Sequence, residues 1–312
     1  MERSVKIYYS LWKITSVVIL IAPFILSCSS GKYSSPLNYQ LSVLVEQKRY
    51  AEAEKVAKKT LESTIKQLGE NHPDVAGALN NLATVYYLQK RAVEASQMYL
   101  TALIILEKAP DKDLSLVAEV IYNLAVLYQD HGRYADAKPL LEKSIIMWKK
   151  TLGPDNPNVA RAFNKLAGNY KNQKKYMEAE LFYLRAIDIL TKVHGENNID
   201  VAYSMNNLAN LYATLSRYPE AEKLYKRSLE IMEKIGGSYS IDVVASLLNM
   251  SKLYRIQGKC IEADLLYKRS KKISEEIFGK RAPSLTETPP VFGMCIKSMA
   301  GSDEYKNLDM PA

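Results

Sequence analysis

The stretch that decides the fold runs from residue 202 to residue 225 and reads AYSMNNLANLYATLSRYPEAEKLY. Its first half repeats apolar residues at steps of three and four, the spacing of one helix face: Met205, Leu208, Ala209 and Tyr212. A polar turn follows, and Pro219 then stands where the first turn of a helix tolerates proline. The stretch therefore predicts two consecutive helices joined by a short turn.

The same pattern returns every 42 residues without insertion or deletion. It forms aligned columns at Leu82, Leu124, Leu166, Leu208 and Met250, at Tyr86, Tyr128, Tyr170, Tyr212 and Tyr254, and at Ala53, Ala95, Ala137, Ala179, Ala221 and Ala263. A fixed period of this length is the signature of a solenoid of stacked helix pairs. The columns also explain why the chain has 22 Tyr but only 5 Phe, because most of the tyrosines repeat at packing positions.

Three kinds of segment carry a family resemblance: LGENHPDVA at 68–76 with LGPDNPNVA at 152–160, NNLA at 80–83 and 206–209, and RYPEAEKLY at 217–225. They resemble the tetratricopeptide repeat in its 42-residue, kinesin-light-chain-like form. The resemblance implies an all-α fold, a right-handed superhelical solenoid of antiparallel helix pairs. It also implies a concave groove, lined by the first helix of each pair, that binds protein partners.

The columns divide the chain into five segments. A divergent N-terminal repeat occupies residues 37–75, and five repeats of 42 residues occupy 76–280. Before them we expect a signal peptide at 1–27 and a tether at 28–36, and after them a C-terminal tail at 281–312. The tail either caps the solenoid, occupies the groove or is disordered, and the sequence does not choose among these three.

The N-terminus has the pattern of an export signal. Basic residues precede an apolar run at 14–26, and small residues follow it. Residues 25–28 (Ile-Leu-Ser-Cys) resemble the lipobox of bacterial lipoproteins, which implies lipidation of Cys28 and a membrane anchor. Ser29 favours the outer membrane, facing the periplasm. The alternatives are an ordinary signal peptide with an incidental Cys, and an uncleaved signal anchor that leaves the repeats in the cytoplasm.

Residues of the first helix in each repeat form the predicted peptide-binding groove. They are Asn81, Asn123, Arg161, Asn164, Lys165, Lys171, Asn206, Asn207, Asn249, Lys252 and Arg255. Asn both donates and accepts hydrogen bonds, so a row of Asn suits the main chain of an extended peptide. The basic residues among them favour a peptide with acidic side chains.

Two other interpretations of these residues stay open. Asn123 with Arg161 and Lys165 resembles part of the carboxylate clamp of tetratricopeptide co-chaperones, but Gly77 and Glu119 depart from the clamp pattern. Alternatively, the Asn column braces neighbouring helices, and the basic residues are an ordinary solvated helix face.

The sequence predicts no enzyme, cofactor or metal site. Its three His are far apart in sequence, and no phosphate-binding loop or nucleophile motif occurs. The formal charge of +8 for 312 residues is a mild excess, and no basic-aromatic stripe indicates nucleic-acid binding. Cys260 and Cys295 either pair or remain separate thiols.

These observations predict a non-enzymatic scaffold, anchored by lipid in the bacterial envelope, that binds an extended acidic segment of a partner protein. An assembly factor for an envelope or pilus machine, similar to a pilotin, is the alternative in the same class. An accessory domain for cell-wall enzymes belongs to another class, but it requires exposed aromatic residues. The sequence leaves the partner's identity and the oligomeric state open.

Overall fold

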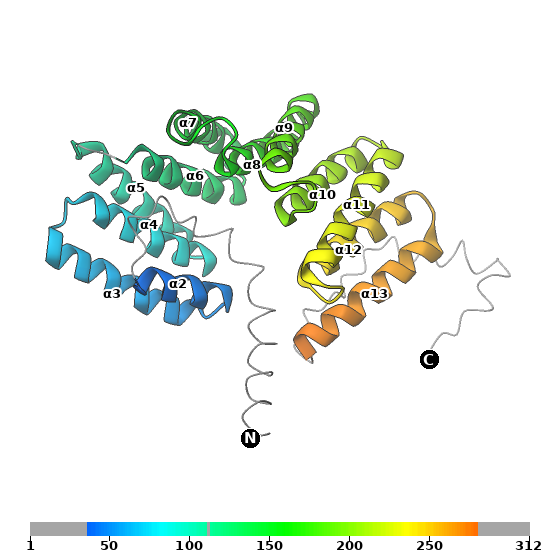
Figure 1. Cartoon of the computed structure of the whole chain (residues 1–312), viewed down its shortest axis with the longest axis horizontal. Helices are drawn as coiled ribbons and strands as arrows, with labels where there is room; N and C mark the ends of the chain where they lie inside the picture. The colour runs from blue at the N-terminus through cyan, green and yellow to red at the C-terminus, as the bar shows by residue number, and fades with distance from the viewer. Residues whose placement is uncertain (1–35, 111–112, 280–312) are drawn as a thin grey trace, which may run out of the picture. The chain divides into compact units, whose positions relative to one another are not determined.

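The computed structural model describes residues 36–110 and 113–279 and forms two compact units, which meet in sequence at Lys175 and Tyr176. Regular structure in these residues consists of α-helices, labelled in Figure 1. The first unit contains α2 (Pro36–Glu46), α3 (Tyr50–Leu68), α4 (Pro73–Leu88), α5 (Ala92–Lys108), α6 (Leu114–Asp130), α7 (Tyr134–Leu152) and α8 (Pro157–Asn172). The second contains α9 (Tyr176–His194), α10 (Ile199–Thr214), α11 (Tyr218–Gly236), α12 (Ile241–Ile256) and α13 (Cys260–Phe278). The predicted all-α repeat fold is confirmed.

Each repeat contributes two helices, which we call helix A (α2, α4, α6, α8, α10, α12) and helix B (α3, α5, α7, α9, α11, α13). Side chains just before helix A accept hydrogen bonds from its first turn, which satisfies backbone N–H groups that lack a helical partner. Asn156 accepts from the Asn158 amide at 2.9 Å, and Asn198 accepts from the Asp200 amide at 2.8 Å. These caps fix where α8 and α10 begin.

The turn from helix A to helix B has a left-handed backbone at one position in every repeat. The φ angles there are 56° at Lys48, 64° at Lys90, 74° at Gly132, 60° at Lys174, 58° at Ser216 and 75° at Gly258. Only two of the six residues are Gly, although an L side chain makes this conformation costly. The turn geometry therefore comes from the packing of the helices rather than from the local sequence.

The core of each unit lies between helices A and B. The Ala column of helix B is at most 2% exposed in all six repeats, and such small side chains let packed helix backbones approach closely. Tyr99, Tyr183 and Tyr225, and the larger Trp148, are also buried beside these alanines. The tyrosines that begin helix B are only half-buried, for example Tyr134 and Tyr176, so this column is less enclosed than the sequence suggests.

Several predictions from the sequence concern residues outside the described part of the chain. They include the signal peptide at 1–27, Cys28 and most of the tether, and the tail at 281–312. Cys260 begins α13 and takes part in a disulfide bond, but its partner also lies outside the described residues. The structure therefore does not test whether Cys260 pairs with Cys295, which the sequence left open. Among the described helices, none combines the length and apolar character needed to cross a membrane.

Candidate protein-binding surface on helices A

Three members of the predicted Asn column connect consecutive helices A. The Asn81 side chain on α4 donates to Asn38 Oδ1 on α2 at 3.4 Å, and Asn123 on α6 donates to Asn80 Oδ1 on α4 at 3.0 Å. In the second unit, Asn249 on α12 donates to Asn206 Oδ1 on α10 at 2.9 Å. Each bond joins residues 43 positions apart, so these amides hold neighbouring repeats in register. The geometry agrees with the bracing interpretation for these three residues.

The remaining Asn residues of the predicted site differ in exposure. Asn207 on α10 is exposed, whereas Asn206 beside it is 7% exposed and accepts from both Asn249 and Asn210. Asn164 on α8 is half-buried. Asn207 is therefore the Asn of its column that solvent reaches most easily, and Asn206 belongs to the packing beneath it.

The predicted basic groove residues of the first unit lie on α8. The Arg161 guanidinium lies 5.0 Å from the centre of the Tyr122 ring on α6 and donates to Asn158 Oδ1 at 3.0 Å. Stacking on an aromatic face holds a guanidinium in place while its edge still meets solvent. Lys165 and Lys171 are half-buried on the same helix. The structure thus brings all three basic residues to one helix of this unit.

The predicted basic groove residues of the second unit lie on α12. Lys252 is exposed and Arg255 is half-buried. Like Lys165, neither residue forms an ion pair with another described residue. Their charges are consequently not neutralised within the part of the chain that the structure describes.

The acidic residue that departs from the clamp pattern in the sequence, Glu119, is buried. Glu119 on α6 is 8% exposed and accepts a hydrogen bond from Asn80 at 3.3 Å, and Asn80 in turn accepts from Asn123. The carboxylate therefore joins an internal polar chain between α4 and α6. It lies beneath the surface on which Asn123 and Arg161 stand.

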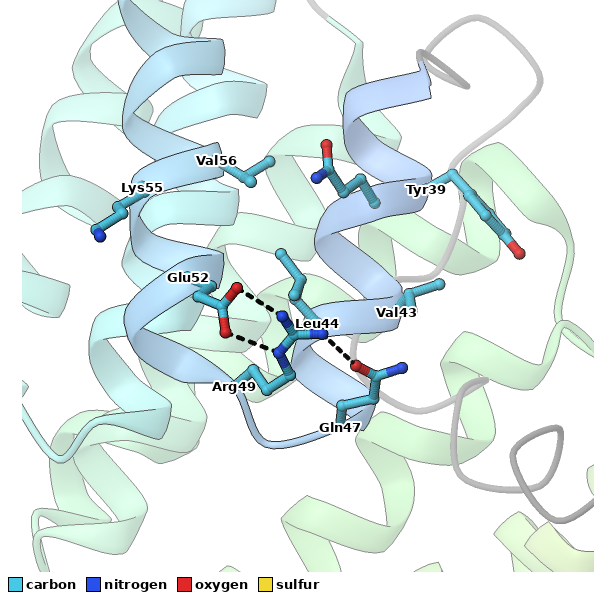
Figure 2. A pocket seen from close by; sticks show the side chains of 9 residues that line it. Tyr39, Val43, Leu44, Gln47, Arg49, Glu52, Lys55 and Val56 are labelled. Atoms are coloured by element: carbon cyan, nitrogen blue, oxygen red, sulfur yellow. Dashed lines mark hydrogen bonds and ion pairs between the residues drawn. The ribbon is translucent and has the colours of Figure 1, made fainter. Parts of the chain in front are cut away.

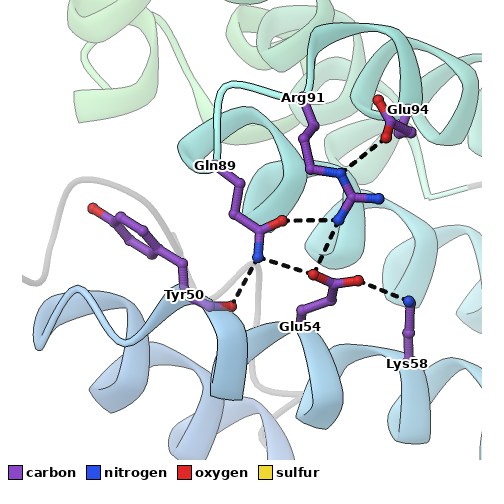
Figure 3. Close-up of polar contacts among 6 residues, drawn as sticks. All are labelled: Tyr50, Glu54, Lys58, Gln89, Arg91 and Glu94. Atoms are coloured by element: carbon purple, nitrogen blue, oxygen red, sulfur yellow. Dashed lines mark hydrogen bonds and ion pairs between the residues drawn. The ribbon is translucent and has the colours of Figure 1, made fainter.

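In a second column of basic residues, which the sequence analysis missed, Arg91, Arg217 and Lys259 each join their repeat to the one before it. Arg91 lies 4.2 Å from the centre of the Tyr86 ring and donates to Glu54 on α3 at 3.1 Å (Figure 3). Arg217 repeats the arrangement with Tyr212 at 3.9 Å and donates to both Glu180 oxygens at 3.0 Å. Arg and Lys recur at 42-residue spacing in the sequence, at Arg49, Arg91, Arg133, Lys175, Arg217 and Lys259, which is the signal that finds them.

Two carboxylates bound by these basic residues, Glu54 and Glu222, are held in their charged form. Hydrogen bonds from Lys58, Gln89 and Arg91 lower the pKa of Glu54 to about 2. Bonds from Lys226 and then Tyr254 lower the pKa of Glu222 as well. Because these donors come partly from the following repeat, the charge of each carboxylate stabilises the contact between repeats.

The three His have local structural roles. His72 Nδ1 accepts from the Asp74 amide at the start of α4, and His131 Nδ1 lies 2.8 Å from the Leu127 carbonyl oxygen at the end of α6. His194 is the last residue of α9. Within residues 36–110 and 113–279, no cluster of three or more His, Cys, Asp or Glu side chains has the arrangement of a metal site.

Stacked helix pairs, a side-chain brace between repeats and a polar face on helix A together define a helical-repeat binding protein. The family model for the tetratricopeptide repeat matches residues 42–108, 116–192, 158–234 and 200–276. The chain therefore belongs to the tetratricopeptide repeat family, whose members are generally non-enzymatic scaffolds.

Solved structures show the same fold at low sequence identity. BtubC (BKLC) from P. vanneervenii is 21% identical with a TM-score of 0.61, covering 78% of this chain and 93% of its own. A kinesin light chain of Podosopora anserina, with nearly identical repeats, is 22% identical with a TM-score of 0.55. The match covers 67% of this chain and 99% of that one. Among curated proteins, none matches the sequence. The comparisons thus establish the kinesin-light-chain-like fold and leave the ligand to be inferred.

Proposed function

We propose that this protein is a scaffold of the bacterial envelope that binds an extended, acidic segment of a partner protein along its helices A. The observation that carries the proposal is the set of unneutralised basic side chains on these helices: Lys165 in the first unit, and Lys252 and Arg255 in the second. Asn207 and the stacked Arg161 supply hydrogen-bond donors near them. Solvated lysine and arginine attract an acidic chain, and Asn pairs with its backbone.

The charge of the partner is tested with matched double variants. We expect Lys165→Glu/Lys252→Glu to retain about tenfold less of the partner in affinity capture from solubilised envelopes, because two attractive contacts become repulsive. The control is Lys143→Glu/Lys223→Glu, which changes exposed lysines of helices B and gives the same net charge. Equal retention by both variants, with helicity unchanged by circular dichroism, would refute binding along helices A.

The membrane anchor is a separate part of the proposal, supported by the lipobox-like residues 25–28. A diacylated or triacylated Cys28 would hold the protein on the membrane stably, since one acyl chain alone binds only weakly. Cys28→Ser is expected to abolish the lipid mass shift and to move the protein from the detergent phase to the aqueous phase. Unchanged mass and partitioning in this variant would show that Cys28 carries no lipid anchor.

A further inference from the structure

The first repeat has an open side that resembles an interface inside the solenoid. Helices α2 and α3 border a pocket of about 480 Å³ (Figure 2). Its walls include the apolar side chains Val43 and Val56 and the polar side chains Gln47 and Arg49. Tyr39 stands at its edge and is 74% exposed. We call this surface the end face.

The polar residues of the end face repeat those of the second repeat. Arg49 Nη1 donates to Gln47 Oε1 at 2.9 Å, and Arg49 Nε donates to Glu52 at 2.7 Å. Forty-two residues later, Arg91 Nη1 donates to Gln89 Oε1 at 3.1 Å, and Arg91 Nε donates to Glu94 at 2.9 Å. The two sets have the same local geometry, so they present the same donors to whatever packs beside them.

In the second repeat these donors hold a carboxylate of the preceding helix. Gln89 Nε2 donates to Glu54 Oε2 at 2.9 Å, and Arg91 Nη1 donates to the same oxygen at 3.1 Å (Figure 3). Gln89 also donates to the Tyr50 carbonyl oxygen at 3.2 Å. The occupant of this interface is therefore an α-helix that carries a carboxylate in its first turns.

Apolar packing distinguishes the two interfaces. Val85 on α4 is fully buried and Leu82 is 3% exposed, whereas the equivalent residues of the first repeat, Val43 and Gln40, are half-buried and exposed. The side of helix A that α3 covers in the second repeat is thus uncovered in the first. Continuity with an interface seen inside the same chain indicates what kind of element fits there.

We propose that the end face binds an amphipathic α-helix of another protein. The apolar side chains of that helix would pack on Val43 and Val56, and its carboxylate would be held by Gln47 and Arg49. This second binding surface is distinct from the one on helices A. It recognises a folded helix instead of an extended segment.

Residues 1–35 do not supply this helix. Residues 1–35 contain one carboxylate, Glu2, and four basic residues, so their charge opposes Arg49. A second copy would offer α13, whose Asp264 stands in the column of Glu54. However, α13 carries exposed Lys271 where the other helices B have Leu61, Leu103, Ile145, Ile187 and Leu229. Packing against the end face would bury that lysine, which disfavours a second copy.

The test uses a helix that fits the equivalent interface. A fluorescent peptide with the sequence of α3, residues 50–68, is stapled between positions 55 and 59, which are exposed on α3, so that it is already helical. Binding to the full chain is measured by fluorescence anisotropy. We expect saturable binding, weakened about tenfold by Arg49→Glu and by the change Glu54→Lys in the peptide. The Glu54→Lys peptide is expected to regain binding on the Arg49→Glu protein.

Two controls separate this interface from other effects. Arg133→Glu breaks the ion pair with Asp136, just as Arg49→Glu breaks the ion pair with Glu52. Because Arg133 lies inside the solenoid, this variant is expected to leave peptide binding unchanged. Lys165→Glu/Lys252→Glu is also expected to leave it unchanged. Absence of saturable binding, equal loss in Arg133→Glu, or no regain in the charge-swapped pair would each overturn the proposal.

Discussion

At the scale of single residues, one arrangement of three side chains joins successive repeats at Arg91, Arg217 and Lys259. A guanidinium or ammonium group lies on the Tyr that ends helix A, as Arg217 does on Tyr212 and Lys259 on Tyr254. The same cation meets a carboxylate of the preceding helix B, Glu180 or Glu222. Arg serves best, because its planar group stacks on the ring and bonds both carboxylate oxygens at once. The contact thus makes a polar surface the site of a specific interaction between repeats.

The depressed pKa of Glu54 predicts how acid acts on this joint. A carboxylate whose pKa is about 2 in the folded state and near 4.5 when unfolded stabilises the fold above pH 4.5. That contribution is lost as the pH falls from 4.5 through 2. We expect Glu54→Gln to lower the free energy of unfolding at pH 7 and to flatten its decline below pH 4.5. Denaturant titrations of both proteins at pH 7, 4 and 3 measure this, and parallel curves would contradict it.

The sequence identified the residues on helices A but not all of their contacts. The repeat pattern places Asn in a column, but the bonds of Asn81, Asn123 and Asn249 reach 43 residues back, a register that depends on how helices A pack. Bracing was one of its open interpretations, and Asn123 bonded to Asn80 agrees with it. Burial of Glu119 also follows only from packing, since its position in the helix pattern marks it as a groove residue.

At the scale of elements, the turn between helices A and B keeps its shape without glycine in four repeats. Lys90 has a φ of 64°, which strains an L residue. We expect Lys90→Gly to stabilise the protein by about 0.5–1 kcal/mol, because relief of strain exceeds the entropy that Gly adds to the unfolded chain. Lys90→Ala removes the same charge but retains the Cβ atom. Equal unfolding free energies for these two variants would show that the turn is not strained.

The helices themselves follow closely from the sequence. The Ala column runs through all six repeats, and Pro73 and Pro157 mark the first residues of α4 and α8. Proline is tolerated there because the first turn needs no N–H partner. The sequence did not predict the end face, because the role of Gln47 and Arg49 is recognised only by comparison with the contacts of Gln89 and Arg91.

At the scale of the whole molecule, the chain is a repeat scaffold, and the binding residues that we propose lie in both units. The first unit offers Arg161 and Lys165 on α8, and the second offers Lys252 and Arg255 on α12. Among the described residues of both units, no cluster of His, Cys, Asp or Glu side chains has the arrangement of a metal site. Repeat proteins use the surface of their helices for binding, so the fold and these charges together favour recognition of an acidic protein segment.

The most direct test locates the partner on the molecule. A photo-crosslinking amino acid is placed singly at Lys165 or Lys252 on helices A, and at Lys143 or Lys223 on helices B of the same units. The account predicts that irradiated envelopes yield a crosslinked partner from positions 165 and 252, with acidic residues near the attachment point by mass spectrometry. Crosslinks from positions 143 and 223 alone would contradict it and would place the binding surface on helices B.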